Sequence, residues 1–132
     1  MSFEIFDKYL IGDISVWRSG GTPLKTNKNN WDGNIPWISA KNLKVGKISD
    51  SKIKITQKGL EIGSRLAAVG DILLLVRGSG LFNDIPIGIV EKPVAFNQDV
   101  KAIEVNCEII APYFFYYWLL ANKPMPFYHR FF

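Results

Sequence analysis

The sequence predicts an α+β domain: a compact mixed β-sheet with a few short helices and one aromatic-rich helix near the C-terminus. Three observations lead to this fold class. Residues Asp71–Val76 form a continuous apolar run between Gly70 and Gly78, which is typical of a strand covered on both faces. Shorter segments with strand character recur along the chain. Pro112 opens an apolar run that continues to Ala121, and proline in the first turn favours a helix.

The first half of the chain alternates short strands with polar connections. Residues 14–18 alternate like a strand, which Gly20 and its neighbour then end. Residues 22–33 are rich in Asn, Lys, Gly and Pro, so we expect a loop there. Residues 35–39 predict another short strand. A turn and a further strand near 53–55 follow.

A short helix is expected after Thr56, whose hydroxyl can cap its first turn. This helix should extend to about Leu66, and Leu60, Ile62 and Leu66 are its candidate buried positions. Further strands are predicted at residues 85–90 and 100–105. The helix at 112–121 is apolar nearly all round, so it should be buried on several sides or docked against a partner.

The length of 132 residues and the composition indicate one globular domain. We expect residues 1–121 to form this domain and residues 122–132 to form an irregular tail. Nearly half of the residues are apolar. The longest nearly apolar run, residues 109–120, is much shorter than a membrane span. The start of the chain lacks the pattern of a secretory signal, and the single cysteine, Cys107, cannot form an internal disulfide. The expected compartment is therefore the cytoplasm.

Positive charge is concentrated in the first half of the chain. The formal net charge is +4, and residues 1–66 hold 11 Lys and Arg against 6 Asp and Glu. Between residues 41 and 58 there are six lysines and a single acid, Asp50. Such a run is often a solvated face, but it also suits DNA phosphates, which lysines bind without reading sequence. Both interpretations stay open on charge alone.

Polar side chains at the ends of two predicted strands suggest base recognition. Arg77 closes the strand at 71–76, and Asn97 and Gln98 precede the strand at 100–105. Arginine, asparagine and glutamine can read guanine and adenine edges through paired hydrogen bonds. Each also has a structural alternative, since Arg77 can pair with a local acid such as Asp71 or Asp99, and the amides can satisfy buried backbone groups. Trp37 can stack on a base, although a position in the core is the commoner one.

The sequence contains little that would support an enzymatic function. The glycines around Ser79 lack the helix and the Lys-Ser/Thr pair that nucleotide-binding loops need, and no cofactor is expected. His129 is the single histidine, which leaves little material for a catalytic triad or a histidine metal site. One alternative is a Mg²⁺-dependent nuclease site, in which Asp84 and Asp99 hold the metal and Lys101 assists the attacking water.

Five segments together resemble a known family. They are Ser-Gly-Gly-Thr-Pro at 19–23, Ile-Pro-Trp-Ile-Ser at 35–39, Gly-Asp-Ile-Leu through Arg-Gly-Ser at 70–79, Phe-Asn-Gln-Asp at 96–99, and the aromatic helix at 113–120. Each segment is unspecific alone, but their order is specific. Across about residues 10–121 the chain resembles a target recognition domain of a type I restriction-modification specificity subunit.

This resemblance implies a non-catalytic module that reads one half of a split double-stranded DNA site. In such systems, helical spacers bind methyltransferase subunits that use S-adenosylmethionine, and a motor subunit cuts unmodified DNA. The sequence ends where a long spacer would begin, so the chain is expected to be an isolated half-subunit or a fragment, and a second half-subunit is a further possible partner. An alternative function is a protein-interaction module that uses the helix at 112–121.

The candidate DNA-binding residues combine lysines for phosphates with polar side chains for base edges. They are Lys25, Lys28, Asn29, Asn30, Lys41, Asn42, Lys44, Lys47, Arg77, Ser79, Asn97 and Gln98. Motifs shared by a family whose targets differ are expected to build its scaffold. The residues that read bases are therefore expected in the less patterned loops at 24–34 and 44–58.

Overall fold

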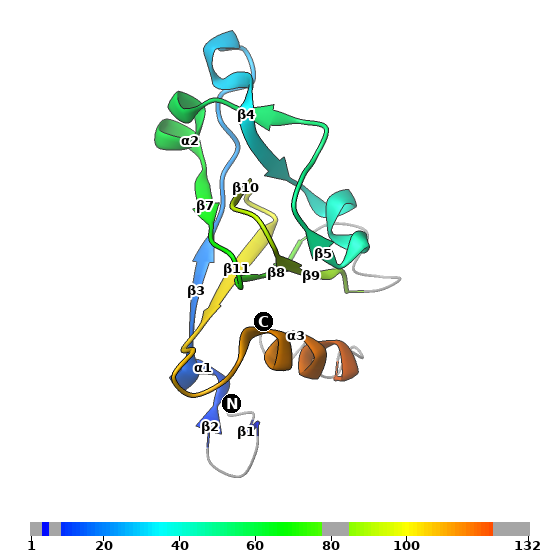
Figure 1. Ribbon diagram of the computed structural model, residues 1–132. Helices are drawn as coiled ribbons and strands as arrows, with labels where there is room; N and C mark the ends of the chain where they lie inside the picture. The colour runs from blue at the N-terminus through cyan, green and yellow to red at the C-terminus, as the bar shows by residue number, and fades with distance from the viewer. Residues whose placement is uncertain (1–3, 6–8, 78–84, 123–132) are drawn as a thin grey trace.

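Two β-sheets lie between layers of short helices (Figure 1). The structure, a computed structural model, describes residues 4–5, 9–77 and 85–122. From one end to the other, the layers are a C-terminal helix, a five-stranded sheet, a four-stranded sheet and a short helix with its adjoining loops. This mixed arrangement confirms the predicted α+β class.

The five-stranded sheet has the order β3-β11-β8-β9-β5. Its strands are β3 (Ser15–Ser19), β11 (Val100–Val105), β8 (Ile72–Leu75), β9 (Ile87–Val90) and β5 (Lys47–Ile48). All neighbours are antiparallel except β5 and β9, which run parallel. β8 therefore lies in the middle of the sheet, where the sequence predicted a strand covered on both faces.

The four-stranded sheet has the order β6-β4-β10-β7. Its strands are β6 (Lys54–Ile55), β4 (Trp31–Ile38), β10 (Val94–Phe96) and β7 (Arg65–Ala67). β4 and β10 pair in parallel, whereas β6 and β7 pair antiparallel to their neighbours. β10 is fully buried, and the short segment that follows it leads into β11 of the five-stranded sheet.

Short helices and one small ribbon complete the fold. They are α1 (Ile11–Ile14), the 3₁₀ turns η1 (Lys28–Asn30) and η2 (Ala40–Val45), α2 (Gln57–Gly63), α3 (Pro112–Ala121), and the ribbon of β1 (Glu4–Ile5) and β2 (Tyr9–Leu10). α3 has the bounds that the sequence predicted. In the described part of the chain, no helix is long and apolar enough to cross a membrane.

The alternation of side chains along β8 divides the core into two layers. Ile72 and Leu74 face the cluster that contains Phe115 of α3, whereas Leu73 and Leu75 face the other sheet. Phe96 fills the space between the sheets and is fully buried. Both faces of β8 are thus excluded from water, which explains the continuous apolar sequence of this strand.

A third, smaller cluster lies between the four-stranded sheet and α2. Trp37 is 8% exposed and packs there with Ile55 and Ala95, while Trp31 contacts it edge-on with ring centroids 5.4 Å apart. Leu60 of α2 is partly buried against this cluster. Trp37 therefore occupies the core, the commoner of the two positions expected for it.

The strand expected near residues 53–55 is β6, and η2 and β5 precede it in the lysine-rich segment. Two local expectations were wrong. The polar segment at 22–33 is not a loop throughout, because it contains η1 and the start of β4. The helix after Thr56 ends at Gly63, and Ile62 and Leu66 are 64% and 45% exposed. Pairing of β7 with β10 outweighs helix propensity there, since Leu66 lies opposite Ala95 in the ladder.

Candidate nucleic-acid interface

Four of the sequence motifs meet at one place, which we call the junction: residues 19–22, 37–38, 77 and 96–99. The backbone N–H of Gly21 donates to the Phe96 carbonyl at 2.9 Å. The indole N–H of Trp37 donates to the Gly21 carbonyl at 3.1 Å, and the Thr22 hydroxyl donates to Oε1 of Gln98. The junction is therefore a closed network of backbone and side-chain hydrogen bonds.

Glycine is required at position 20 by close backbone packing. A Cβ atom on Gly20 would lie 2.3 Å from the Phe96 carbonyl oxygen and 2.4 Å from that of Asn97. Neither oxygen can move independently, because the Phe96 carbonyl also accepts hydrogen bonds from Gly21 and the Ser64 hydroxyl, and the Asn97 carbonyl accepts the Val100 N–H at 3.3 Å. The Ser-Gly-Gly-Thr-Pro motif thus marks a packing constraint.

The predicted base readers at the junction are largely engaged within the protein. Arg77 is exposed, yet its Nε lies 3.3 Å from Oδ1 of Asp99 and its Nη2 donates to the Gln98 carbonyl at 3.0 Å. Asn97 is only 9% exposed, and its Oδ1 accepts the Asp99 backbone N–H at 3.0 Å. Burial prevents Asn97 from reaching a base edge while this turn is formed. Gln98 is exposed, and Thr22 holds its amide oxygen.

The nuclease alternative gains no support from this geometry. Asp99 pairs with Arg77, and Nζ of Lys101 donates to the Ser19 hydroxyl at 2.6 Å. Asp84 and the candidate base reader Ser79 lie outside the described residues. Among residues 4–5, 9–77 and 85–122, no three His, Cys, Asp or Glu side chains form a potential metal site.

A second group of candidates lies at the opposite end of the molecule from α3 (Figure 1). We call it the tip: residues 24–34 together with Thr56, Gln57 and Lys58. The Thr56 hydroxyl donates to the Asn29 carbonyl at 2.6 Å, and its backbone N–H donates to the Asn30 carbonyl at 2.9 Å. Since Thr56 also caps α2, one residue joins the loop to the helix.

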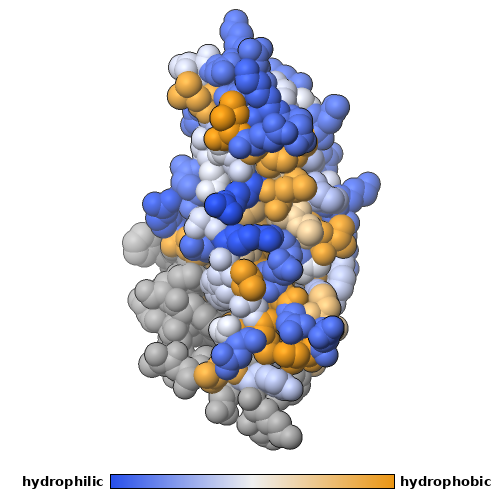
Figure 2. Space-filling view, turned by 90° about the vertical axis from the view of Figure 1, so that its left-hand side faces the viewer, coloured by the Kyte–Doolittle hydropathy of each residue, from blue (hydrophilic) through white to orange (hydrophobic). Residues whose placement is uncertain are grey.

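Exposure within the tip separates surface residues from structural ones. Lys25, Lys28 and Asn29 are exposed, as a DNA-contacting role requires. Asn30 is 2% exposed, and its Nδ2 donates to the Leu24 carbonyl at 3.1 Å. Asn30 therefore fixes the loop from inside, which corrects its place among the surface candidates. In Figure 2, the upper end of the face shown, where the tip lies, is mostly hydrophilic.

A third group surrounds η2 and β5, which we call the lysine side. Lys41, Lys44 and Lys47 are exposed there. Asn42 is half-buried, because its Oδ1 accepts the Ser39 backbone N–H at 2.9 Å and so caps η2. Asn42 is therefore engaged in local structure. β4 (Trp31–Ile38) connects this side to the tip.

A cation that the sequence argument missed adjoins the lysine side. Lys92 is exposed in the connection between β9 and β10, and its charge contributes to lowering the pKa of Asp50. The main causes of that lowered pKa are the Ser51 backbone N–H and then Lys54, whose Nζ lies 3.2 Å from Oδ1 of Asp50. Lys92 is distant in sequence from the lysine run, so no local pattern indicated it.

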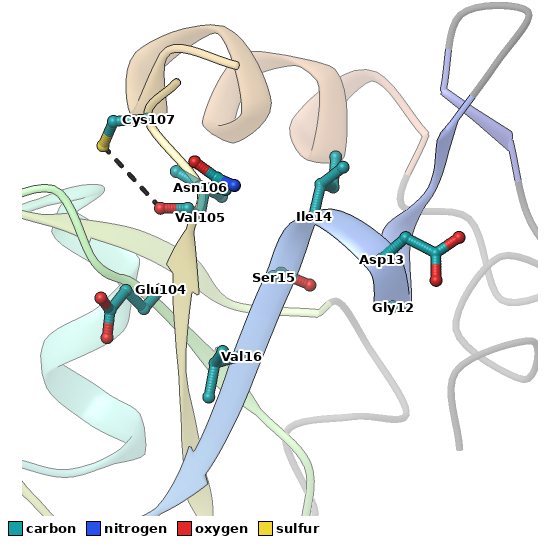
Figure 3. Close-up of a pocket in the computed structure, with 9 residues that line it drawn as sticks. All are labelled: Gly12, Asp13, Ile14, Ser15, Val16, Glu104, Val105, Asn106 and Cys107. Atoms are coloured by element: carbon teal, nitrogen blue, oxygen red, sulfur yellow. Dashed lines mark hydrogen bonds between the residues drawn. The ribbon is translucent and has the colours of Figure 1, made fainter. Parts of the chain in front are cut away.

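A surface depression lined by residues 12–16 and 104–107 lies at the end of the molecule away from the tip (Figure 3). Its side chains are not arranged for a chemical reaction. It is formed by the start of β3 and the end of β11. Its two carboxylates, Asp13 and Glu104, point away from one another. The Cys107 thiol donates a hydrogen bond to the Val105 carbonyl oxygen at 3.8 Å. The exposed polar residues of the tip and the lysine side therefore remain the strongest candidate interface.

Comparison with known proteins agrees with the resemblance seen in the motifs. The family model described as "Type I restriction modification DNA specificity domain" matches residues 4–129. Because this match covers nearly the whole chain, the protein belongs to that family. The predicted family membership is confirmed.

Among its relatives, the chain is 32% identical to the Type I restriction enzyme EcoR124I/EcoR124II specificity subunit of Escherichia coli, over 80% of this chain. It is also 32% identical to the Type I restriction enzyme MjaIX specificity subunit of Methanocaldococcus jannaschii, over 91% of this chain. The chain spans about a quarter of each relative, 27% in both cases.

Two solved structures have a similar fold. One comes from work on complex assembly and conformational transition of the type I R-M system, with a TM-score of 0.63 and 17% identity. The other is an HsdS subunit from Thermoanaerobacter tengcongensis, with a TM-score of 0.54 and 11% identity. Each comparison covers 86% of this chain and 27% of the other.

Proposed function

We propose that the protein binds double-stranded DNA and recognises a specific base sequence, as one half of the target site of a type I restriction-modification complex. Membership of the DNA specificity domain family carries this proposal. In this role the chain selects the site, and the chemistry belongs to partner subunits. The exposed lysines support it, since phosphate contacts supply most of the affinity of such interfaces.

The proposed interface combines two regions with separate tasks. Lys41, Lys44 and Lys47 of the lysine side contact phosphates and so position the duplex. The tip presents Lys28 and Asn29 to the DNA. A single module of this size is expected to bury about 600–1,000 Å² of its surface on DNA. Because β4 joins the two regions directly, both are proposed to contact one duplex.

The proposed protein partners are methyltransferase subunits, a restriction motor subunit that joins through them, and a second half-subunit. Residues 1–121 are proposed to form the recognition domain, with a helical spacer beginning after it. These proposals rest on the relatives, both of which are specificity subunits about four times as long as the matched region.

Selection from a random duplex library tests the DNA proposal. The purified chain should enrich one short motif at low salt and leave the DNA intact, with or without Mg²⁺. Binding without enrichment would contradict sequence recognition by this chain. Cleavage that requires Mg²⁺ and is abolished by Asp99→Asn would instead support a nuclease.

A second candidate function is protein interaction through α3. The side chains of Tyr113, Phe114 and Tyr117 are 41%, 47% and 52% exposed, which is unusual for aromatic residues on one helix. Tyr113 donates a hydrogen bond to Glu91, and this contact raises the pKa of the Tyr113 hydroxyl. Replacing Tyr117 with Ser should weaken assembly with methyltransferase subunits while leaving the enriched DNA motif unchanged. Loss of DNA enrichment instead would place α3 in the DNA interface.

A further inference from the structure

The β4 strand interrupts its pairing with β6 to form an outward bulge. Trp31 and Ile35 both lie opposite Ile55 in the strand register, so the three residues between them are extruded from the ladder. Asp32 and Asn34 are exposed in this bulge, whereas Trp31 and Ile35 pack against the core cluster beneath α2. The bulge therefore points two polar side chains away from the sheet.

Backbone geometry at the bulge is unusual. Asp32 has a φ of 62°, and among the described residues no other non-glycine residue has a positive φ. The left-handed conformation costs free energy for a residue with a Cβ, although aspartate tolerates it better than most. Glycine would adopt it freely, and Gly33 lies next to it. The conformation at Asp32 therefore fixes the direction in which its exposed carboxylate leaves the strand.

Close packing fixes the shape of the bulge. A Cβ on Gly33 would lie 2.4 Å from the Ile55 carbonyl oxygen and 2.6 Å from Cα of Thr56, so the chain approaches β6 closely at this point. Thr56 in turn holds the Asn29 and Asn30 carbonyls. The bulge and the loop before it are thus fixed to the same residue. Side chains presented by such a rigid support do not need to be ordered on binding, which favours specific contacts.

The polar side chains of the bulge are available to a ligand. Within the described residues, no hydrogen bond or ion pair engages the side chains of Asp32, Asn34 or Asn29. This distinguishes them from Arg77, Asn97 and Gln98 at the junction, which are engaged within the protein. Aspartate accepts a hydrogen bond from the cytosine amino group, and asparagine pairs with adenine.

We propose that the bulge at residues 32–34 is a base-reading element, in which Asp32 and Asn34 contact base edges in the major groove and determine part of the target sequence. Asn29, in the adjoining loop, extends the same surface. This inference rests on the proposed DNA-binding function and assigns specificity to residues outside the family motifs. Asp32 and Asn34 lie in the segment at 24–34 where the sequence led us to expect base readers, although neither was among the individually named candidates.

Conservative substitutions test the proposal without altering backbone shape. The 132-residue chain, with Asp32→Asn or Asn34→Asp, is used for selection from a random duplex library and compared with the unchanged chain. Asp13→Asn is the matched control, since it makes the same exchange on an exposed aspartate at the other end of the molecule. Thermal unfolding of each variant checks that the fold is retained.

Each bulge variant should change the preferred base at one or two positions, with about a tenfold loss of discrimination at the original base. Affinity for unselected DNA should change much less, because phosphate contacts dominate it. Asp13→Asn should select the original motif. If the unchanged chain enriches a motif and both bulge variants enrich the same one, the bulge is not a reader and DNA recognition stands. If the unchanged chain enriches none, both proposals fail.

Discussion

The indole N–H of Trp37 donates to the carbonyl oxygen of Gly21 at 3.1 Å, joining two motifs that are 16 residues apart in sequence. Trp37 is 8% exposed, so this hydrogen bond is shielded from water. It shows why the Ile-Pro-Trp and Ser-Gly-Gly-Thr-Pro segments occur together. They form a scaffold that supports the tip, and a scaffold can be shared by proteins with different DNA targets.

Replacing Trp37 with Phe should lower stability without changing DNA preference. The substitution leaves the Gly21 carbonyl without its indole donor and removes part of a buried ring. We expect a loss of about 1–3 kcal/mol in the free energy of unfolding, measured by urea titration. The motif enriched from a duplex library should be unchanged. A changed motif would show that Trp37 contacts DNA.

Replacing Gly20 with Ala adds only one methyl group, but it should lower the stability of the fold strongly. The added Cβ would overlap two backbone oxygens at 2.3 and 2.4 Å, and we expect a loss of about 3 kcal/mol in the free energy of unfolding. Gly12→Ala is the control, because a Cβ there would meet nothing within 4 Å. Equal stability of the two variants would contradict the packing described at the junction.

Lysines of the proposed interface should determine how strongly DNA binding depends on salt. Each of Lys44→Ala and Lys47→Ala should flatten the plot of log affinity against log salt by about one unit, and the double variant by about two. Arg65→Ala removes the same charge from exposed residue 65, which lies on β7, an edge strand of the four-stranded sheet, whereas β5 of the lysine side belongs to the five-stranded sheet. An effect of Arg65→Ala equal to that of Lys44→Ala would indicate a general charge effect.

Asp71 should make stability depend on pH in the acidic range. Its side chain is buried beside Arg18, with Nη2 and Oδ2 2.7 Å apart. Burial raises the pKa of Asp71, although the Ala68 N–H and Arg18 act in the opposite direction. The folded state therefore binds a proton more readily than the unfolded chain. The stabilisation of the folded state by this proton is fully present below the ordinary carboxyl pKa of about 3.9, and it is lost as pH rises through the raised pKa of Asp71.

Urea titrations of the unchanged chain and of Asp71→Asn between pH 4 and 7 measure this contribution. In the unchanged chain, the Ala68 N–H donates to Oδ2 of Asp71 at 3.0 Å. The asparagine of the variant keeps a side-chain oxygen that can accept this hydrogen bond. The stability of the unchanged chain relative to the variant should fall as pH rises. A relative stability that increases with pH would mean that the ion pair with Arg18 outweighs the cost of burial.

The sequence predicted the buried elements better than the exposed ones. The strand at Ile72–Leu75 and the helix at Pro112–Ala121 follow from apolar runs, which burial requires directly. α2 ends earlier than expected, because β7 pairs with β10, a segment about 30 residues away. Such pairing leaves no local signal. Lys92 was missed for the same reason, because only the folded structure brings it next to the lysine side.

The candidate site was only partly predictable for a related reason. Residue type suggested Asn30, Asn42 and Asn97, but each amide is used in local structure. Whether an amide faces inward depends on contacts between distant segments. Conversely, the Asp-Gly pair at 32–33 was a recognisable turn signal within the predicted loop. Its place in a bulge on a long strand became evident only from the register with β6.

Hydrogen exchange of the chain bound to its own enriched duplex tests the proposed DNA interface. We expect slower exchange on binding in the tip at residues 24–34 and on the lysine side at 41–47. α3 at Pro112–Ala121 should exchange as it does in the free protein. Slower exchange confined to α3, with the tip unchanged, would contradict the proposed interface.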